Sequence, residues 1–184
     1  MDRARLIALL RERSVATGDF VLASGRRSHW YIDCRRTTMH AEGLALIGAL
    51  GLAAIRDAGW TPAAVGGLTL GADPVAYAIA RASHDAPPAV HGFTVRKQAK
   101  AHGAGGGRRV EGCFEPGMPV VVVEDVITTG GSALAAAAAV RDAGGQIVGV
   151  FAVVDREEGG REAIAAAGHA VQSLLRGSEL LGAS

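Results

Sequence analysis

Cysteine is scarce in this chain, and long apolar segments are missing. Cys34 and Cys113 stand apart, outside any Cys-x-x-Cys pair or Cys/His cluster, so the sequence indicates neither a disulfide framework nor a zinc site. We expect both to be small buried hydrophobic residues. The longest nearly unbroken apolar stretch, residues 43–55, is too short to cross a bilayer. The N-terminus lacks the apolar segment and cleavage site of a signal peptide, so we expect a cytoplasmic protein.

An excess of charge of either sign is also missing. Nineteen Lys and Arg residues against eighteen Asp and Glu residues leave a net charge of +1 at pH 7. We therefore expect neither nucleic acid nor a membrane as a partner, and any phosphate site must come from a local cluster. A length of 184 residues with 49% hydrophobic and 20% charged residues predicts one soluble globular domain, residues 1–184.

Helix and strand patterns alternate along most of the chain. An amphipathic helix is expected over 2–16, followed by extended pieces around 20–22 and 30–33 that a turn at 24–28 joins. Further helices are expected over 41–58, 74–83, 131–143 and 158–168, and strands over 63–67, 90–95, 119–123, 147–154 and 170–174, with a short return around 109–114. This order is typical of an α/β fold with an open, mainly parallel sheet flanked by helices, which binds ligands at the carboxyl ends of its strands.

The most informative segment runs from a continuous valine strand into a helix. Glu124 and Asp125 end the strand, and the segment Thr128-Thr129-Gly130-Gly131-Ser132, called the phosphate loop below, opens the helix. Backbone N–H groups at a helix start attract an anion, and glycines let the backbone approach a phosphate closely. The two carboxylates suit sugar hydroxyls or a nearby Mg²⁺ ion. The alternative is an ordinary strand, acidic turn and helix cap.

A second cationic segment follows the strand expected at 90–95. Arg96, Lys97, Lys100 and His102 fall within seven residues, and Gly103 to Gly107 are rich in glycine. Lys97 and Lys100 are the only lysines in the chain, which indicates that a compact ammonium group is needed there. The alternative is a solvated surface loop, but the segment leaves the same edge of the sheet as the phosphate loop.

These segments resemble a known family. The string from Glu124 to Ser132 is similar to the phosphoribosyl-pyrophosphate signature of type I phosphoribosyltransferases, and the pattern Arg96-Lys97-x-x-Lys100-x-His102-Gly103 resembles the catalytic loop of orotate phosphoribosyltransferases. Residues 20–28, 66–74 and 153–156 also resemble segments of that family, so the likeness covers roughly residues 18–160.

The resemblance implies a type I phosphoribosyltransferase fold in which residues 1–40 and the C-terminal end form a small hood over the base pocket. It implies a pentosyltransferase of pyrimidine biosynthesis that transfers 5-phosphoribosyl from phosphoribosyl pyrophosphate to orotate. It also implies Mg²⁺ held mainly through substrate and water, with no direct protein ligand assigned, and a cytoplasmic homodimer whose loop 96–109 acts in trans.

The resemblance assigns roles to particular residues. Lys100 and Asp125 would be catalytic. Orotate would contact Tyr31, Ile32, Thr128 and Arg156. Phosphoribosyl pyrophosphate would contact Arg96, Lys97, Lys100, His102, Glu124, Asp125, Val126, Ile127, Thr128, Thr129, Gly130, Gly131 and Ser132.

Three alternatives stay open from the sequence. Arg156 can be a structural residue paired with Glu157 or Glu158 instead of a ligand for a carboxylate. The enzyme can use another base, such as a purine or uracil. The chain can also be a regulator that senses phosphoribosyl pyrophosphate without turning it over.

Overall fold

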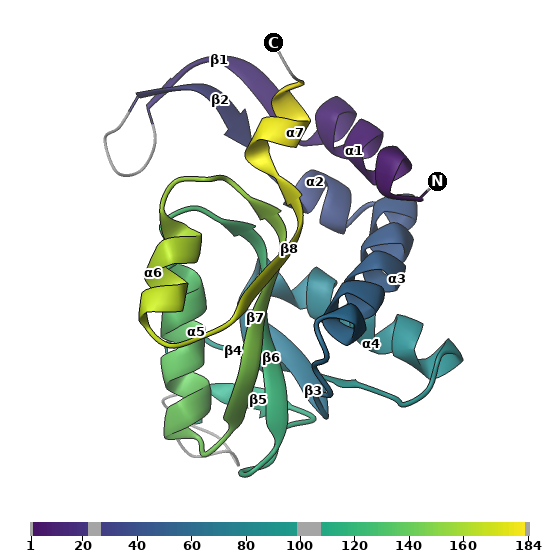
Figure 1. Cartoon of the computed structure of the whole chain (residues 1–184), viewed down its shortest axis with the longest axis vertical. Coiled ribbons are helices and arrows are strands. Elements are labelled where there is room, and N and C mark those ends of the chain that lie inside the picture. The colour runs from purple at the N-terminus through teal and green to yellow at the C-terminus, as the bar shows by residue number, and fades with distance from the viewer. Residues whose placement is uncertain (1, 22–26, 99–107, 183–184) are drawn as a thin grey trace.

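The computed structural model describes residues 2–21, 27–98 and 108–182. Its main sheet has the strand order β5-β4-β3-β6-β7-β8, and all neighbouring strands are parallel except β4 and β5. Figure 1 shows α3 and α4 on one face of this sheet and α5 and α6 on the other. The expected open, mainly parallel α/β sheet is confirmed.

The bounds of the elements follow the expected order closely. The strands are β1 Val15–Val21, β2 Arg27–Ile32, β3 Ala64–Leu68, β4 His91–Val95, β5 Val110–Gly112, β6 Pro119–Ile127, β7 Gln146–Asp155 and β8 Val171–Arg176. The helices are α1 Asp2–Arg13, α2 Arg35–Thr38, α3 Ala41–Asp57, α4 Ala72–Asp85, α5 Gly131–Asp142, α6 Gly160–Ala166 and α7 Gly177–Leu181.

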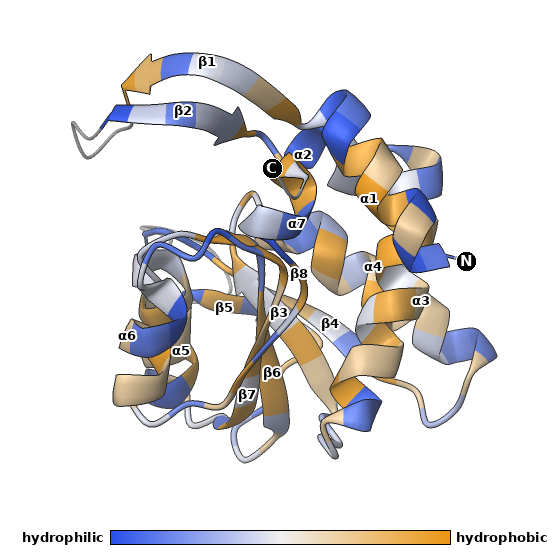
Figure 2. Cartoon of the chain, turned by 45° about the horizontal axis from the view of Figure 1, so that its top comes forward, coloured by the Kyte–Doolittle hydropathy of each residue, from blue (hydrophilic) through white to orange (hydrophobic). Residues whose placement is uncertain are grey.

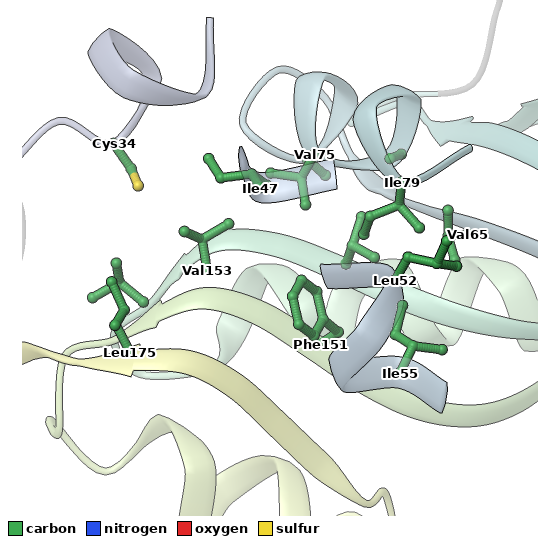
Figure 3. Close-up of a cluster of buried hydrophobic side chains, with 14 of the residues drawn as sticks. Cys34, Ile47, Leu52, Ile55, Val65, Val75, Ile79, Phe151, Val153 and Leu175 are labelled. Atoms are coloured by element: carbon green, nitrogen blue, oxygen red, sulfur yellow. The ribbon is translucent and has the colours of Figure 1, made fainter. Parts of the chain in front are cut away.

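The central strand β6 shows why the sheet is buried on both faces. Val120 to Val123 are completely buried. Because side chains alternate along a strand, Val121 and Val123 join the cluster beneath α3 and α4, whereas Val120 and Val122 join the cluster beneath α5. Figure 3 shows the first cluster, in which Phe151 and Val153 of β7 lie among side chains from the covering helices.

A separate two-stranded antiparallel sheet, the β1–β2 hairpin, precedes α2. It projects beyond the main sheet in Figure 1. In Figure 2 β6 and β7 are coloured as hydrophobic, whereas β2 is hydrophilic over most of its length. The C-terminal α7 packs beside α1, where Arg11 donates hydrogen bonds to the carbonyls of Glu179 and Leu180 at 2.7 and 2.9 Å. The helices α1 and α7 therefore pack together on one side of the hairpin.

Two expectations about the elements were wrong, and two short helices were not predicted. The first helix ends at Arg13 rather than at 16, because the buried Ser14 turns the chain and bonds Thr37 through their hydroxyls at 2.7 Å. The helices α2 and α7 have four and five residues, too short for a periodic signal. Cys34 is buried as expected, but Cys113 is exposed because it follows the three-residue edge strand β5. No helix in the described ranges has the length and apolar character needed to span a membrane.

Candidate active site

The candidate active site lies where the carboxyl ends of β6 and β7 meet the end of the hairpin. A hollow of about 220 Å³, called the base hollow below, lies between the hairpin on one side and the ends of β6 and β7 on the other. From the hairpin and the turn after it come Tyr31, Ile32, Asp33, Cys34 and Arg35; from the ends of β6 and β7 come Asp125, Val126, Thr128 and Arg156.

A second hollow of about 50 Å³ adjoins it at the start of α5. It is lined by Glu124 and by residues 126–133, which include the whole phosphate loop. Gly130 has φ +82°, a left-handed conformation that favours glycine, and an added Cβ would lie 2.9 Å from the carbonyl oxygen of Gly160. The first N–H groups of a helix have no partner within it, so the start of α5 presents donors to an anion.

The acidic pair lies within β6 itself, and burial changes its protonation. Glu124 is 5% exposed, and its Oε1 atom has no hydrogen-bond partner among the described residues. Burial, with a smaller contribution from the charge of Asp125, raises the pKa of Glu124 to about 8. Burial also raises the pKa of Asp125, opposed by the hydrogen bond that the Val126 N–H donates to Oδ1 at 2.9 Å. This shift favours the protonated form of Glu124 in the folded protein.

Asp125 also touches the loop that follows β3. A Cβ added to Gly71 would lie 2.6 Å from Oδ1 of Asp125 and 2.9 Å from Oδ2. Gly71 precedes α4, so the carboxylate bridges the end of β6 and the start of that helix. Position 71 must therefore be glycine if the Asp125 carboxylate is to stay where it is.

Arg156 lies directly after β7. It forms an ion pair and also lines the base hollow, so it combines the two roles that the sequence left as alternatives. It is 7% exposed, and its Nη2 atom lies 2.9 Å from Oε1 of Glu158. Glu157 instead accepts the N–H of Ser178 at 2.8 Å. Arg156 nevertheless lines the base hollow, and its Nε atom has no partner within the described ranges. Pairing with Glu158 therefore does not prevent Arg156 from also lining the base hollow.

The cationic segment is described only in part. Arg96 follows β4, two strands from β6, and its Nη1 atom lies 3.2 Å from Oε2 of Glu111 on β5. Lys97 is exposed. Lys100 and His102 lie outside the described residues. Within the ranges that are described, no group of three or more His, Cys, Asp or Glu side chains is arranged to hold a metal ion.

The sequence reasoning missed several residues of the site. Asp33 and Arg35 line the base hollow, and the Arg35 Nε donates to Asp33 Oδ1 at 2.8 Å. The signal available was their position: Asp33 ends the second expected extended piece, and Arg35 follows it closely. Gly71 gave no signal of its own, because its partner Asp125 is 54 positions away in the printed sequence.

The chain was compared with families, curated proteins and solved structures. The phosphoribosyl transferase domain family matches residues 38–167. The chain is 46% identical to the orotate phosphoribosyltransferase of Aquifex aeolicus, covering 98% of each chain. It is 49% identical to that of Corynebacterium glutamicum, covering 97% of this chain and 93% of the relative.

Solved structures agree. The orotate phosphoribosyltransferase of Mycobacterium tuberculosis in complex with phosphoribosyl pyrophosphate matches with a TM-score of 0.83 and 44% identity, covering 99% of this chain and 100% of that chain. The adenine phosphoribosyltransferase of Saccharomyces cerevisiae, at 18% identity and a TM-score of 0.68, shares the fold. Sequence identity and fold agree over nearly the whole length, and this chain belongs to the orotate phosphoribosyltransferase family.

Proposed function

We propose how this chain transfers the 5-phosphoribosyl group of phosphoribosyl pyrophosphate to N1 of orotate, giving orotidine 5′-phosphate and pyrophosphate. The observation that carries the assignment is that the phosphate-loop hollow and the base hollow share Val126 and Thr128. A ribose bound over these residues would have its 5′-phosphate in one hollow and the base in the other. The reaction requires this order of groups.

The phosphate loop, Thr128 to Ser132, would hold the 5′-phosphate. Its glycines and the donors at the start of α5 are suited to that group, with Val126 and Ile127 forming the adjoining backbone. Glu124 and Asp125 would accept hydrogen bonds from the ribose hydroxyls. The unpartnered Oε1 of Glu124 supports this role, since a buried acceptor without a partner costs about 1–3 kcal/mol that a bound hydroxyl would recover.

Orotate would lie in the base hollow against Tyr31, Ile32 and Thr128. Arg156, which lines this hollow, would bind its carboxylate through the guanidinium. This contact would separate orotate from uracil, which lacks the carboxylate.

The leaving pyrophosphate requires positive charge. Arg96, Lys97, Lys100 and His102 would stabilise the negative charge that develops on it, and Lys100 is our choice for the catalytic contact. Closure of this segment would also exclude water, which otherwise attacks the activated ribose.

Mg²⁺ fits the residues present. Carboxylate oxygens are hard ligands, and Glu124 has one buried oxygen without a partner among the described residues. When bound, the ion would neutralise part of the pyrophosphate charge. We propose that substrate and water supply most of its ligands and that Asp125 and Glu124 orient them.

We further propose that residues 1–184 form one domain in which the hairpin and α7 act as the hood over the base hollow. The protein would be a cytoplasmic homodimer in which loop 96–109 reaches over the partner's phosphate loop.

Pyrophosphate release with orotate, uracil, adenine and hypoxanthine tests the assignment of the base. We expect turnover with orotate, and we expect Arg156→Lys to raise the orotate KM more than the phosphoribosyl-pyrophosphate KM, because lysine keeps the charge but loses the fork. Equal use of uracil and orotate would contradict the role of Arg156. Binding of phosphoribosyl pyrophosphate without turnover of any base would favour a sensor instead.

A further inference from the structure

Besides its ion pair with Glu158, the guanidinium of Arg156 contacts strand β2 of the hairpin, which is far from it in sequence. Its Cζ atom lies 4.4 Å from the centroid of the Trp30 ring. Its Nη2 atom donates to the Ser28 hydroxyl and to the Trp30 carbonyl, each at 3.4 Å. These two hydrogen bonds are long and therefore weak. The cation–π contact with the Trp30 ring is the more favourable interaction that β2 makes with the guanidinium.

Trp30 is itself fixed on its other side. A Cβ added to Gly177, the first residue of α7, would lie 3.1 Å from Cζ2 and 3.2 Å from Cη2 of the ring. The indole also packs against the core cluster beneath α3 and α4. The ring therefore has little freedom to move, because Gly177 leaves just enough room for it.

The described polar contacts of the Arg156 guanidinium are made by Nη2, which meets Ser28, Trp30 and Glu158. Nε is buried and has no partner in the described part of the chain, and the residue lines the base hollow. A planar guanidinium binds a carboxylate through two nitrogens only when its plane has the right orientation. The Trp30 face is the contact that sets this plane, since the Glu158 carboxylate and the Ser28 hydroxyl each hold only one nitrogen.

We propose that Trp30 is a positioning residue for base recognition, which fixes the plane of the Arg156 guanidinium at the edge of the base hollow so that this group meets the orotate carboxylate. This rests on the proposed role of Arg156. It makes the hairpin part of the selectivity for orotate over bases without a carboxylate. An exposed cation on an aromatic face is stabilised weakly, but a desolvated one is held by about 2 kcal/mol or more. Arg156 is of the second kind, with a side chain 4% exposed.

The test compares Trp30→Leu, Trp30→Phe and Arg156→Lys in the full-length protein, with KM measured separately for orotate and for phosphoribosyl pyrophosphate. Trp30→Leu should raise the orotate KM by roughly five- to thirtyfold and leave the phosphoribosyl-pyrophosphate KM within about twofold. Trp30→Phe keeps an aromatic face and should restore part of the loss. The orotate KM of the double variant Trp30→Leu/Arg156→Lys should be little higher than that of Arg156→Lys alone, because both changes remove the same contact between Trp30 and the guanidinium.

Trp60→Leu is the matched control. Trp60 packs against Gly149 near the start of β7, whereas Arg156 follows the other end of that strand. The same change there should leave the ratio of the two KM values unaltered.

The outcomes separate the two levels of the proposal. If Arg156→Lys leaves the orotate KM unchanged, the role of Arg156 itself is wrong. If Arg156→Lys raises it but Trp30→Leu does not, or raises both KM values equally, Trp30 only anchors the hairpin and our inference is overturned. Should Trp30→Leu fail to fold, Trp30→Met decides, because methionine fills part of the space without an aromatic face: an orotate KM unchanged from the unmutated protein would overturn the inference, and a selective increase would support it.

Discussion

Gly71, directly before α4, meets the Asp125 side chain of β6 at the site. Gly71 has φ −64° and ψ −40°, a conformation open to any L-residue, so its lack of a side chain is not required by the backbone. It is required by the Asp125 carboxylate, which occupies the space a Cβ would fill. The position of a proposed catalytic group therefore depends on a missing methyl group.

We predict that Gly71→Ala lowers kcat by roughly ten- to a hundredfold, because a carboxylate displaced by about 1 Å no longer meets its ligand. The free energy of unfolding should change by no more than about 0.5 kcal/mol, since a side chain on a flexible bond can move aside. Steady-state kinetics and urea unfolding measure the two effects.

Gly92→Ala is a fitting control, because the new Cβ would meet only the Tyr77 ring, at 3.3 Å, and a side-chain atom of Ala80. Full activity in Gly71→Ala would show that the observed position of Asp125 is unnecessary.

Glu124 makes stability depend on pH. Its pKa is about 8 in the folded protein and 4.5 ordinarily. Between these values the folded state keeps the proton and the unfolded state has released it, so the free energy of unfolding falls as pH rises through this window. Each pKa unit corresponds to about 1.4 kcal/mol, so the fall amounts to several kcal/mol at most.

We predict that Glu124→Gln, which keeps a neutral side chain of the same shape, flattens this fall. Melting temperatures of the ligand-free protein and the variant from pH 5 to pH 8.5 should diverge steadily, with the variant the more stable at the alkaline end. Parallel curves over that range would mean that Glu124 is already ionised at neutral pH.

At the scale of the elements, Gly130 and Gly131 join β6 to α5, and the backbone requires glycine at the first position but not at the second. Gly130 is left-handed and close to the backbone of Gly160, whereas a Cβ on Gly131 would have nothing nearer than the Thr129 hydroxyl at 3.9 Å. The two residues look equivalent in the sequence.

We predict that Gly130→Ala destabilises the protein by about 1–3 kcal/mol, through the left-handed backbone and the contact with a carbonyl that cannot move aside. Gly131→Ala, in the first turn of α5, should be neutral or slightly stabilising. Urea unfolding of the two variants makes the comparison. An equal loss of unfolding free energy in the two variants would show that the left-handed conformation of Gly130 is not what makes glycine necessary there.

At the scale of the whole molecule, apolar side chains lie exposed beside the site. Met39 is 52% and Leu70 57% exposed, and both line a shallow hollow of about 490 Å³ with Arg35, Arg36 and His40. Asp33, which also borders the base hollow, completes its lining. A surface with large apolar side chains next to the active site supports the proposal that a second copy of the chain covers it.

We predict that inactive Lys100→Ala and inactive Asp125→Ala subunits regain activity when they are mixed and allowed to exchange. If loop 96–109 acts in trans, each mixed dimer has one site with both defects and one with neither, so activity should return to about a quarter of the unmutated level. Pyrophosphate release measures the recovery. A mixture that stays inactive would show that each loop closes over its own subunit.

The sequence alone determined the order of the longer helices and strands and the place of Thr128 to Ser132 at the start of α5, because both depend on local patterns. The valine run of β6 predicts a strand buried on both faces, and the glycines and hydroxyls after it predict an anion site at a helix start. The short helices α2 and α7 were beyond this reasoning, since four or five residues are stabilised by their surroundings rather than by periodicity.

Contacts between distant segments were decided only by the tertiary structure. The sequence could propose Arg156 as a ligand or as a partner of Glu158, but the fold packs it on Trp30, pairs it with Glu158 and still leaves its Nε without a described partner. The burial that raises the pKa of Glu124 arises in the same way, from the elements packed around β6. A side chain's protonation and orientation depend on neighbours that the chain brings together only when it folds.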